Sequence, residues 1–316
     1  MRRLALAAVM AVLFTAPAIA QTELKIMAPA APGGGWDQTA RAMQQALTAE
    51  KIARSVQVVN VPGAGGSVGL AQFVNGAKGD GNQLMVNGFV MVGSLLMNKS
   101  PVSLDQVTPI ARLTEETQVI VVPANSPIKT AKDLADAVKK DVAKTTFAGG
   151  SAGGVDHIMA AMFAGAVGAD ASKVNYVPFS GGGESLAAIL GGKVTAGISG
   201  FGEYEGQIKS GKLRAIGVSS PQRLPGVDVP TFREQGIDLV ITNWRSVMAA
   251  PGISEAQKKA LAETVDRLVK SAAWKDILKQ KGWDDAYLAG DDFAKFLKDE
   301  QARVNAVLRS VGLVKS

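Results

Sequence analysis

The sequence predicts an α/β fold with two parallel-rich sheets, divided between two lobes that two crossover strands join. The first observation is that short β-branched runs alternate with segments of helical period along most of the chain, a pattern typical of parallel sheets covered by helices. The second is a pair of apolar runs, far apart in the chain, that each end at a proline. The third is a set of three glycine-rich loops that follow predicted strands.

Strands are expected where apolar, β-branched residues cluster between turn residues. They are predicted at 24–28, 56–61, 84–86, 117–122, 145–148, 174–177, 194–198, 213–218 and 239–242. Helices are expected between them, and the first runs from about Asp37 to Glu50, with apolar residues at helical spacing on one face. The chain from Ser254 onward is predicted to be helical throughout.

The two proline-terminated runs indicate how the lobes are connected. The run 119–122 ends at Pro123 and precedes Thr130-Ala-Lys-Asp133, whereas 246–250 ends at Pro251 and precedes Ser254-Glu-Ala-Gln257. Each tetrapeptide has the form of a capping box, which starts a helix. We therefore expect both runs to cross between the lobes.

The expected lobes are residues 21–123 with 245–316, and residues 124–244. One large doubly wound domain is the alternative organisation.

The first twenty residues have the pattern of a signal peptide. Arg2 and Arg3 precede an uncharged apolar run, Pro17 interrupts it, and Ala18-Ile-Ala20 offers a cleavage site. We expect cleavage after Ala20 and a soluble protein in the periplasm. An N-terminal membrane anchor is the alternative, although 4–20 is at the short limit for spanning a bilayer.

Composition excludes several classes of site. The chain has no cysteine and one histidine, so thiolate nucleophiles, disulfides and cysteine zinc sites are excluded. We expect no metal and no cofactor; a carboxylate site for a hard cation is the alternative, but no spaced motif indicates one. The formal net charge is +6, but no cluster of Lys and Arg follows a phosphate path. Nucleic acid is therefore not expected as a partner.

The glycine-rich loops are the candidate binding elements. Each connects a predicted strand to a helix, where glycine permits close approach and the helix N-terminus offers N–H groups to an anion. The first loop supplies Gly33, Gly34, Gly35, Trp36 and Asp37, the second supplies Ser151, Gly153, Gly154, Asp156 and His157, and the third supplies Ser180. Asp37 is expected to cap its helix, and orienting the loop is the alternative role. If the lobes face each other, the first two loops meet across a cleft; tight turns without a ligand are the alternative.

The second glycine-rich loop also matches an enzymatic motif. Gly149-Gly-Ser151-Ala-Gly153 matches the nucleophile-elbow pattern, so a periplasmic serine esterase is the alternative function. Its histidine base would have to be His157, which lies on the helix that follows the elbow. The glycine loops lack a complete dinucleotide fingerprint and a Walker A lysine. A binding protein is favoured over an enzyme.

The sequence resembles the receptors of tripartite tricarboxylate transporters, the Bug-type periplasmic proteins. The resemblance rests on several motifs that occur in the right order along the chain. They are Pro32-Gly-Gly-Gly-Trp-Asp37, Val61-Pro-Gly-Ala-Gly-Gly-Ser-Val-Gly69, Val229-Pro-Thr-Phe-Arg-Glu-Gln-Gly236 and Trp244-Arg245. The resemblance covers essentially the whole mature chain. It implies a two-lobed periplasmic binding protein fold, type II-like, that closes on an organic anion.

The resemblance also implies the ligand and the partners. The first two loops would hold a small carboxylate. A citrate-like ligand is favoured over a malate-like one, and aromatic acids are a further alternative. Many family members carry Ser or Thr where this chain has Gly154, which leaves Ser151 to supply a hydroxyl. Arg245 would meet a second carboxylate or form a structural ion pair, and His157 would donate to the ligand or fix its loop. Large and small membrane subunits are the implied partners, and the receptor is expected to be monomeric.

Overall fold

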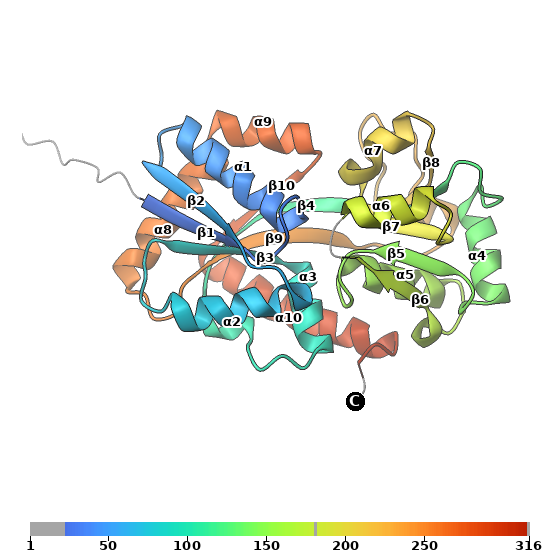
Figure 1. The fold of residues 1–316 in the computed structure, drawn as a ribbon, viewed down its shortest axis with the longest axis horizontal. Helices are drawn as coiled ribbons and strands as arrows, with labels where there is room; N and C mark the ends of the chain where they lie inside the picture. Colours follow the sequence, from blue (N-terminus) through green and yellow to red (C-terminus); the bar gives the residue numbers. More distant parts are fainter. Residues whose placement is uncertain (1–22, 180–181, 315–316) are drawn as a thin grey trace, which may run out of the picture.

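The computed structural model describes residues 23–179 and 182–314 (Figure 1). The expected signal segment 1–20 and Ser180 lie outside the described residues. The strands are β1 (Glu23–Ala28), β2 (Ser55–Asn60), β3 (Gln83–Gly88), β4 (Thr108–Pro123), β5 (Thr146–Gly149), β6 (Asn175–Pro178), β7 (Ala196–Gly200), β8 (Leu213–Val218), β9 (Thr242–Ala249) and β10 (Asp284–Ala289). The helices are α1 (Gly35–Ala49), α2 (Ser67–Gly76), α3 (Phe89–Met97), α4 (Ala131–Lys140), α5 (Val155–Ala166), α6 (Gly182–Leu190), α7 (Phe201–Lys209), α8 (Glu255–Lys270), α9 (Ala272–Lys281) and α10 (Gly290–Ser310).

The fold is α/β and two-lobed, as predicted (Figure 1). In the first lobe β1 lies between β2 and β3, all parallel, and β9, β4 and β10 extend this sheet in antiparallel fashion. In the second lobe β5 lies between β6 and β7, again parallel, and β4 pairs antiparallel with β7 and β8. Strand β4 therefore belongs to both sheets.

Strands β4 and β9 form the connection between the lobes. They pair from Thr108 opposite Ala249 to Thr117 opposite Thr242, and from Gln118 onward β4 pairs with β7 instead. The change of sheet thus falls between Thr117 and Gln118, five positions before Pro123. The helices that follow the two strands, α4 and α8, begin with the capping boxes that the sequence predicts, Thr130 with Asp133 and Ser254 with Gln257.

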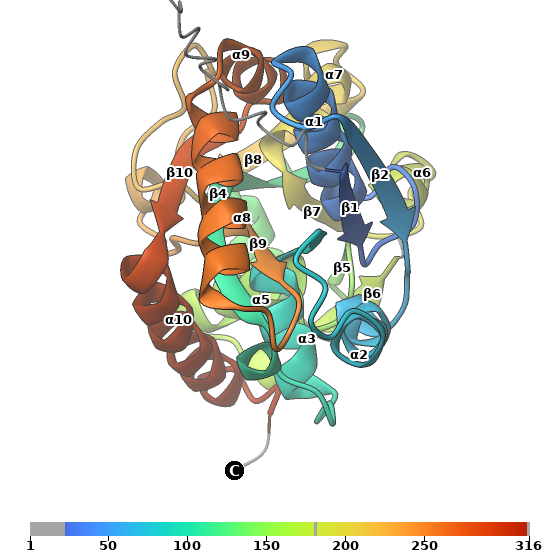
Figure 2. The same ribbon diagram turned by 90° about the vertical axis from the view of Figure 1, so that its left-hand side faces the viewer.

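Helices cover both faces of each lobe (Figures 1 and 2). In α1 the apolar stripe of Ala40, Met43 and Leu47 is buried, and the helix packs against β2 and α9. Helices α8 and α10 pack against β4 (Figure 2). Burial of such stripes is what holds amphipathic helices on a sheet. Across residues 23–179 and 182–314, the helices fall short of the length and apolarity that crossing a bilayer requires.

Two expectations about elements were wrong. The C-terminal region is not helical throughout, because β10 pairs with β4 between two left-handed glycines, Gly282 and Gly290. The strand expected at 239–242 is absent apart from Thr242, where β9 begins. Leu239 is buried in the core in irregular structure. Its apolarity reflects burial, which does not by itself require a strand.

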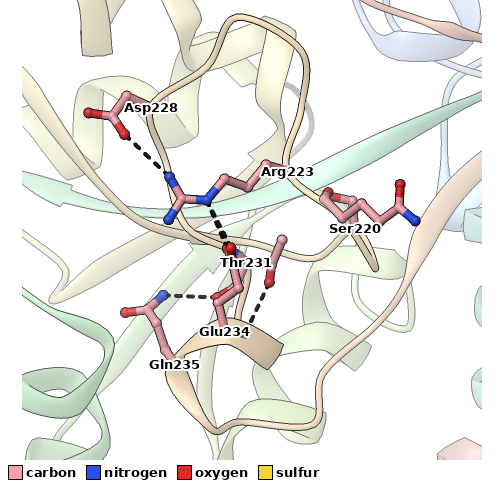
Figure 3. A network of polar contacts seen from close by, with 7 residues as sticks. Ser220, Arg223, Asp228, Thr231, Glu234 and Gln235 are labelled. Carbon is pink, nitrogen blue, oxygen red and sulfur yellow. Dashed lines mark hydrogen bonds and ion pairs between the residues drawn. The ribbon is translucent and has the colours of Figure 1, made fainter.

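The long connection from β8 to β9 is held by a polar network (Figure 3). Arg223 pairs with Glu234 at 2.9 Å and with Asp228 at 3.4 Å. Glu234 also accepts the N–H of Thr231 at 2.8 Å, and Gln235 donates to the carbonyl oxygen of Ile216 on β8. The first three contacts hold the segment together, and the Gln235 contact ties it to β8, which pairs with β4 in the second lobe.

Candidate functional site: a cleft between the lobes

A cleft of about 850 Å³ lies between the lobes. Its walls come from the loops that follow β1, β2, β5, β6 and β7, and strands β4 and β9 cross it. The charged and polar side chains among its lining residues are Gln38, Glu116, Gln118, Ser151, Asp156, Ser185, Ser199, Glu203, Tyr204, Glu205, Asn243, Arg245, Gln280 and Lys281. Both lobes therefore contribute to one binding space.

The loop after β1 is braced from behind by Asp37. Its carboxylate accepts the N–H of Gly33 at 2.8 Å, the Arg41 guanidinium at 3.0 Å and the Asn60 amide at 2.8 Å. Burial alone would raise the pKa of Asp37, but these hydrogen bonds prevail and the pKa is lowered. The cap residue of α1 is Gly34, which has no side-chain cap. Asp37 thus orients the loop and does not cap the helix, contrary to expectation.

The loop after β5 is built in a similar way. Asp156 accepts the N–H of Gly150 at 2.7 Å, and Nδ1 of His157 accepts the N–H of Gly153 at 3.1 Å. The His157 ring stacks on Tyr176, with centroids 4.4 Å apart. Burial lowers the pKa of His157 to about 4, so the ring is neutral at pH 7. His157 fixes its loop, which was one of the two roles expected of it.

The two loops share a backbone pattern. Gly34 donates its N–H to the carbonyl of Ala31 at 3.0 Å, and Gly154 donates to that of Ser151 at 2.9 Å. Gly34 and Gly154 are the cap residues of α1 and α5, and within the described part of the chain neither helix receives a side-chain cap. The first N–H groups of an uncapped helix are available to an anion. Two such termini from opposite lobes approach the same cleft.

Arg245 lies in the cleft but is already paired. Its Nη2 is 2.5 Å from Oε1 of Glu116, and its guanidinium lies 4.9 Å from the centroid of the Trp283 ring. The same Nη2 lies beside Gly35, because a Cβ built at Gly35 would come within 2.7 Å of it. The structural ion pair expected as one alternative is therefore present, and it sets Arg245 beside the first turn of α1.

Carboxylates outnumber cations in this part of the cleft. Burial raises the pKa of Asp156 to about 7; the Gly150 N–H opposes this, and the charges of Glu203 and Glu116 add to it. Burial likewise raises the pKa of Glu116, while Arg245 opposes it. Among residues 23–179 and 182–314, no three His, Cys, Asp or Glu side chains are placed to hold a metal ion.

Sequence reasoning found part of this site. Of the expected residues, Gly33, Gly34, Gly35, Trp36, Ser151, Asp156 and Arg245 line the cleft. Asp37 and His157 instead brace the loops, and Gly153 and Gly154 form the turn of the second loop against α3, where the Gly153 carbonyl lies within 2.0 Å of a Cβ built at Gly93. Ser180 lies outside the described residues.

Several lining residues were missed, namely Glu116 and Gln118 on β4, Asn243 on β9, Glu203 on α7, Trp283 before β10, and the loop Pro62–Gly66. The available signal on β4 was the polar run Glu115-Glu116-Thr117-Gln118, which immediately precedes the apolar run 119–122.

The described residues do not assemble the esterase triad. The Nδ1 acceptor of His157 is occupied by the Gly153 N–H, and the Asp156 carboxylate binds the Gly150 N–H instead of the imidazole. A working triad needs the imidazole between the serine hydroxyl and the carboxylate. This arrangement does not support Ser151 as a nucleophile.

Comparisons with known proteins agree with the fold. A UPF0065 protein of Agrobacterium vitis is 29% identical over 82% of this chain and 78% of its own length, and protein BugT of Bordetella pertussis is 27% identical over 92% and 89%. A solved periplasmic transporter is 26% identical with a TM-score of 0.80, covering 92% of this chain and 98% of its own. The family described as the tripartite tricarboxylate transporter family receptor matches residues 39–313. The chain therefore belongs to this family of periplasmic solute-binding receptors.

Proposed function

We propose that this receptor captures a di- or tricarboxylate between its lobes and delivers it to large and small membrane subunits of a tripartite transporter. The observation that carries the proposal is the pair of helix N-termini, α1 and α5, that reach one cleft from opposite lobes without side-chain caps. Each offers N–H groups and the positive end of a helix dipole to a carboxylate. The membrane subunits are inferred as partners from the family to which the chain belongs.

The proposal includes where the receptor works. Residues 1–20 direct export and are cleaved after Ala20, and the mature protein acts as a monomer in the periplasm. The signal-peptide pattern of the sequence and the periplasmic character of the family support this. Mass spectrometry of the protein purified from periplasmic extract should give an N-terminus at Gln21. An intact N-terminus on membrane-bound protein would contradict it.

A thermal-shift panel tests the ligand class. It contains citrate, malate, longer dicarboxylates and aromatic acids, with a neutral sugar and a simple amine as controls. A ligand at 100 times its dissociation constant stabilises the folded state by about 2.7 kcal/mol, so true ligands should raise the melting temperature measurably. A response to the sugar or to the amine alone, with silence from every carboxylate, would refute the class.

Binding without turnover is part of the same proposal. Incubating the receptor with each responding carboxylate should leave the compound unchanged. Ester hydrolysis that disappears in Ser151→Ala would instead establish the esterase alternative.

A further inference from the structure

We infer that helix α5, which carries the second glycine-rich loop, is fastened to the first lobe at both of its ends. The edge of the molecule where α3, α5 and α10 meet then stays joined when the lobes open. One fastening is α3, at the start of α5. The other is the segment 311–314 that follows α10, which we call the strap and which joins the lobes in addition to β4 and β9.

At its start, α5 is held by α3 of the first lobe. Gly153, in the loop that leads into α5, lies so close to α3 that a Cβ built on it would come within 2.7 Å of the Met97 sulfur. From the other side, a Cβ built on Gly93 of α3 would come within 3.3 Å of Cδ1 of Ile158, near the start of α5. Glycine permits this close approach because it has no side chain. The second loop therefore rests directly on a helix of the first lobe.

Beyond the end of α5, the strap reaches the second lobe from the first. Figure 1 shows the end of α10 extending to the second lobe. Gly312 terminates the helix, with φ of +73° and its N–H donated to the carbonyl of Arg309, as glycine commonly does. A Cβ built on Gly312 would come within 2.6 Å of the Ser172 Cβ. Ser172 belongs to the short helical turn Ala171–Lys173, which packs against α5.

The hydrophobic core is continuous across this edge. Phe89 of α3, Ile158 of α5 and Leu308 of α10 belong to one cluster of buried side chains. Leu313 and Val314 of the strap are half-buried and pack against the same cluster. Separating the lobes here would expose this apolar surface to water, which costs free energy in proportion to the area exposed. The α3–α5–α10 edge is therefore expensive to open.

The opposite edge, where α7 meets α9, is built differently. The buried cluster beneath α6 and α7 includes Ile189 and Tyr204, and among the described residues its members all belong to the second lobe. Across this edge, Gly202 of α7 lies against the backbone carbonyl of Lys281 of α9. Parting a glycine from a carbonyl exposes little apolar surface. The lobes therefore rotate about the α3–α5–α10 edge, and the second loop keeps its place on the first lobe in both open and closed forms.

Spin labels can compare the two edges, because the chain has no cysteine of its own. Two exposed alanines, Ala166 of α5 and Ala306 of α10, report on the joined edge, and the exposed residues Gly206 of α7 and Lys279 of α9 report on the other. Each pair is changed to cysteine in the mature receptor and labelled. Electron paramagnetic resonance then gives the distribution of distances between the two labels.

The measurement is made on the receptor without ligand, so its outcome does not depend on the proposed function. The α5–α10 pair should give a single, narrow distribution, whereas the α7–α9 pair should give a broad distribution or two separate distances. Equal widths at the two edges, or a broader distribution between α5 and α10, would overturn the inference.

Gly312→Ala tests the strap itself in the background that carries the α5–α10 label pair. The added methyl group would press on Ser172, so the distance distribution should broaden and move to longer values. Adding Ser172→Gly removes the opposing Cβ and should restore the narrow distribution. An unchanged distribution in Gly312→Ala would show that the strap does not hold the second lobe, and the inference would be wrong.

Gly211→Ala is the matched control. Gly211 terminates α7 with φ of +69° and donates its N–H to the carbonyl three residues earlier, as Gly312 does, but nothing lies within 4 Å of its built Cβ. Both alanines bear the strain of a left-handed backbone, so the two variants should lose melting temperature alike. Only Gly312→Ala should alter the α5–α10 distances. The same change in Gly211→Ala would mean that general destabilisation is the cause, which would contradict the role of the strap.

Discussion

Asp37 and His157 occupy equivalent positions in the two lobes. Each accepts the N–H of the glycine four residues earlier, Gly33 at 2.8 Å and Gly153 at 3.1 Å. Both glycines are left-handed, with φ of +84° and +77°, and each is followed by the glycine that caps the helix. The carboxylate of Asp37 and the neutral imidazole of His157 thus have the same role. Each holds its glycine-rich loop in place beside the cleft.

Replacing Asp37 with alanine should destabilise the first loop and weaken binding. The change leaves the Gly33 N–H, Arg41 and Asn60 without their shared acceptor, and an unmet buried partner costs about 1–3 kcal/mol. Urea denaturation should show a loss of that size, and affinity should fall with it. A variant with full affinity would show that the loop is held by its backbone alone.

His157→Gln should have a smaller effect on binding. Glutamine keeps an acceptor near Gly153 but loses the stacking on Tyr176, so the affinity should fall by tenfold or less, which is about 1.4 kcal/mol. Titration with the ligand found in the panel measures this. A loss of several orders of magnitude would mean that the imidazole contacts the ligand itself.

The same residue should shape the acid stability of the protein. The pKa of His157 is lowered from 6.5 to about 4, so the unfolded chain binds a proton more readily than the folded one. Stability is lost as the pH falls from about 6.5 toward 4, by at most about 3 kcal/mol. Denaturation across this range should show a shallower loss in His157→Gln than in the wild type.

Asp156 affects the pH dependence of stability in the opposite direction. Its pKa is raised to about 7, so its charged form destabilises the fold, and this cost is lost as the pH falls from 7 toward its ordinary value. Asp156→Asn should therefore be more stable than the wild type at pH 8, with the difference shrinking under acid. Equal stabilities at every pH would contradict the raised pKa.

The sequence predicts most of the parallel framework because β-branched runs and capping boxes are local signals. The start of α1, the boxes at Thr130 and Ser254 and the strands up to Leu213–Val218 follow from such patterns, except that the first part of β4, from Thr108 to Glu116, was not predicted. Strand β10 could not be predicted in the same way. Its sequence, DDAYLA, has little β propensity, and its pairing with β4 supplies the hydrogen bonds that make it a strand.

The residues of the site could be predicted mainly where they lie in glycine-rich loops. Gly33–Gly35 and Ser151 were found because strand–glycine–helix loops have a sequence signature. Glu116 and Asn243 were not, since their roles depend on β4 and β9 pairing across the centre of the molecule. Arg245 illustrates the limit. The register of β4 and β9 sets it opposite Thr114, and only the side-chain contact shows that its partner is Glu116, two residues further along β4.

Gly35→Ala should disturb the cleft through Arg245. An alanine Cβ would lie 2.7 Å from Nη2 of Arg245, so the guanidinium must move away from α1. Affinity should fall about tenfold or more, with little loss of stability because alanine favours the helix. Gly76→Ala, at the end of α2 with nothing near its added Cβ, is the control and should bind normally. Equal affinities of the two variants would show that the position of Arg245 is immaterial.

The two lobes contact each other on both sides of the cleft, and these contacts indicate how the lobes close on a ligand. In the interior, Ser94 of α3 donates to the carbonyl of Ala152 at 3.1 Å. At the opposite side, a Cβ at Gly202 of α7 would come within 2.7 Å of the carbonyl oxygen of Lys281 at the end of α9. The α3 contact joins the second loop to the first lobe, so rotation about β4 and β9 should open the α7–α9 side, in a hinge motion.

Gly202→Ala should therefore hinder closure without unfolding either lobe. The added methyl meets a backbone carbonyl, which cannot step aside as a flexible side chain would. Small-angle scattering of the wild type should show a smaller radius of gyration with bound ligand than without it, and Gly202→Ala should show less compaction and weaker binding. Gly206→Ala, one turn further along α7 with nothing within 4 Å of its Cβ, should behave as the wild type. If a ligand that demonstrably binds leaves the scattering profile of the wild type unchanged, the lobes do not close on it. The proposed hinge motion, and with it the role of Gly202, would then be wrong.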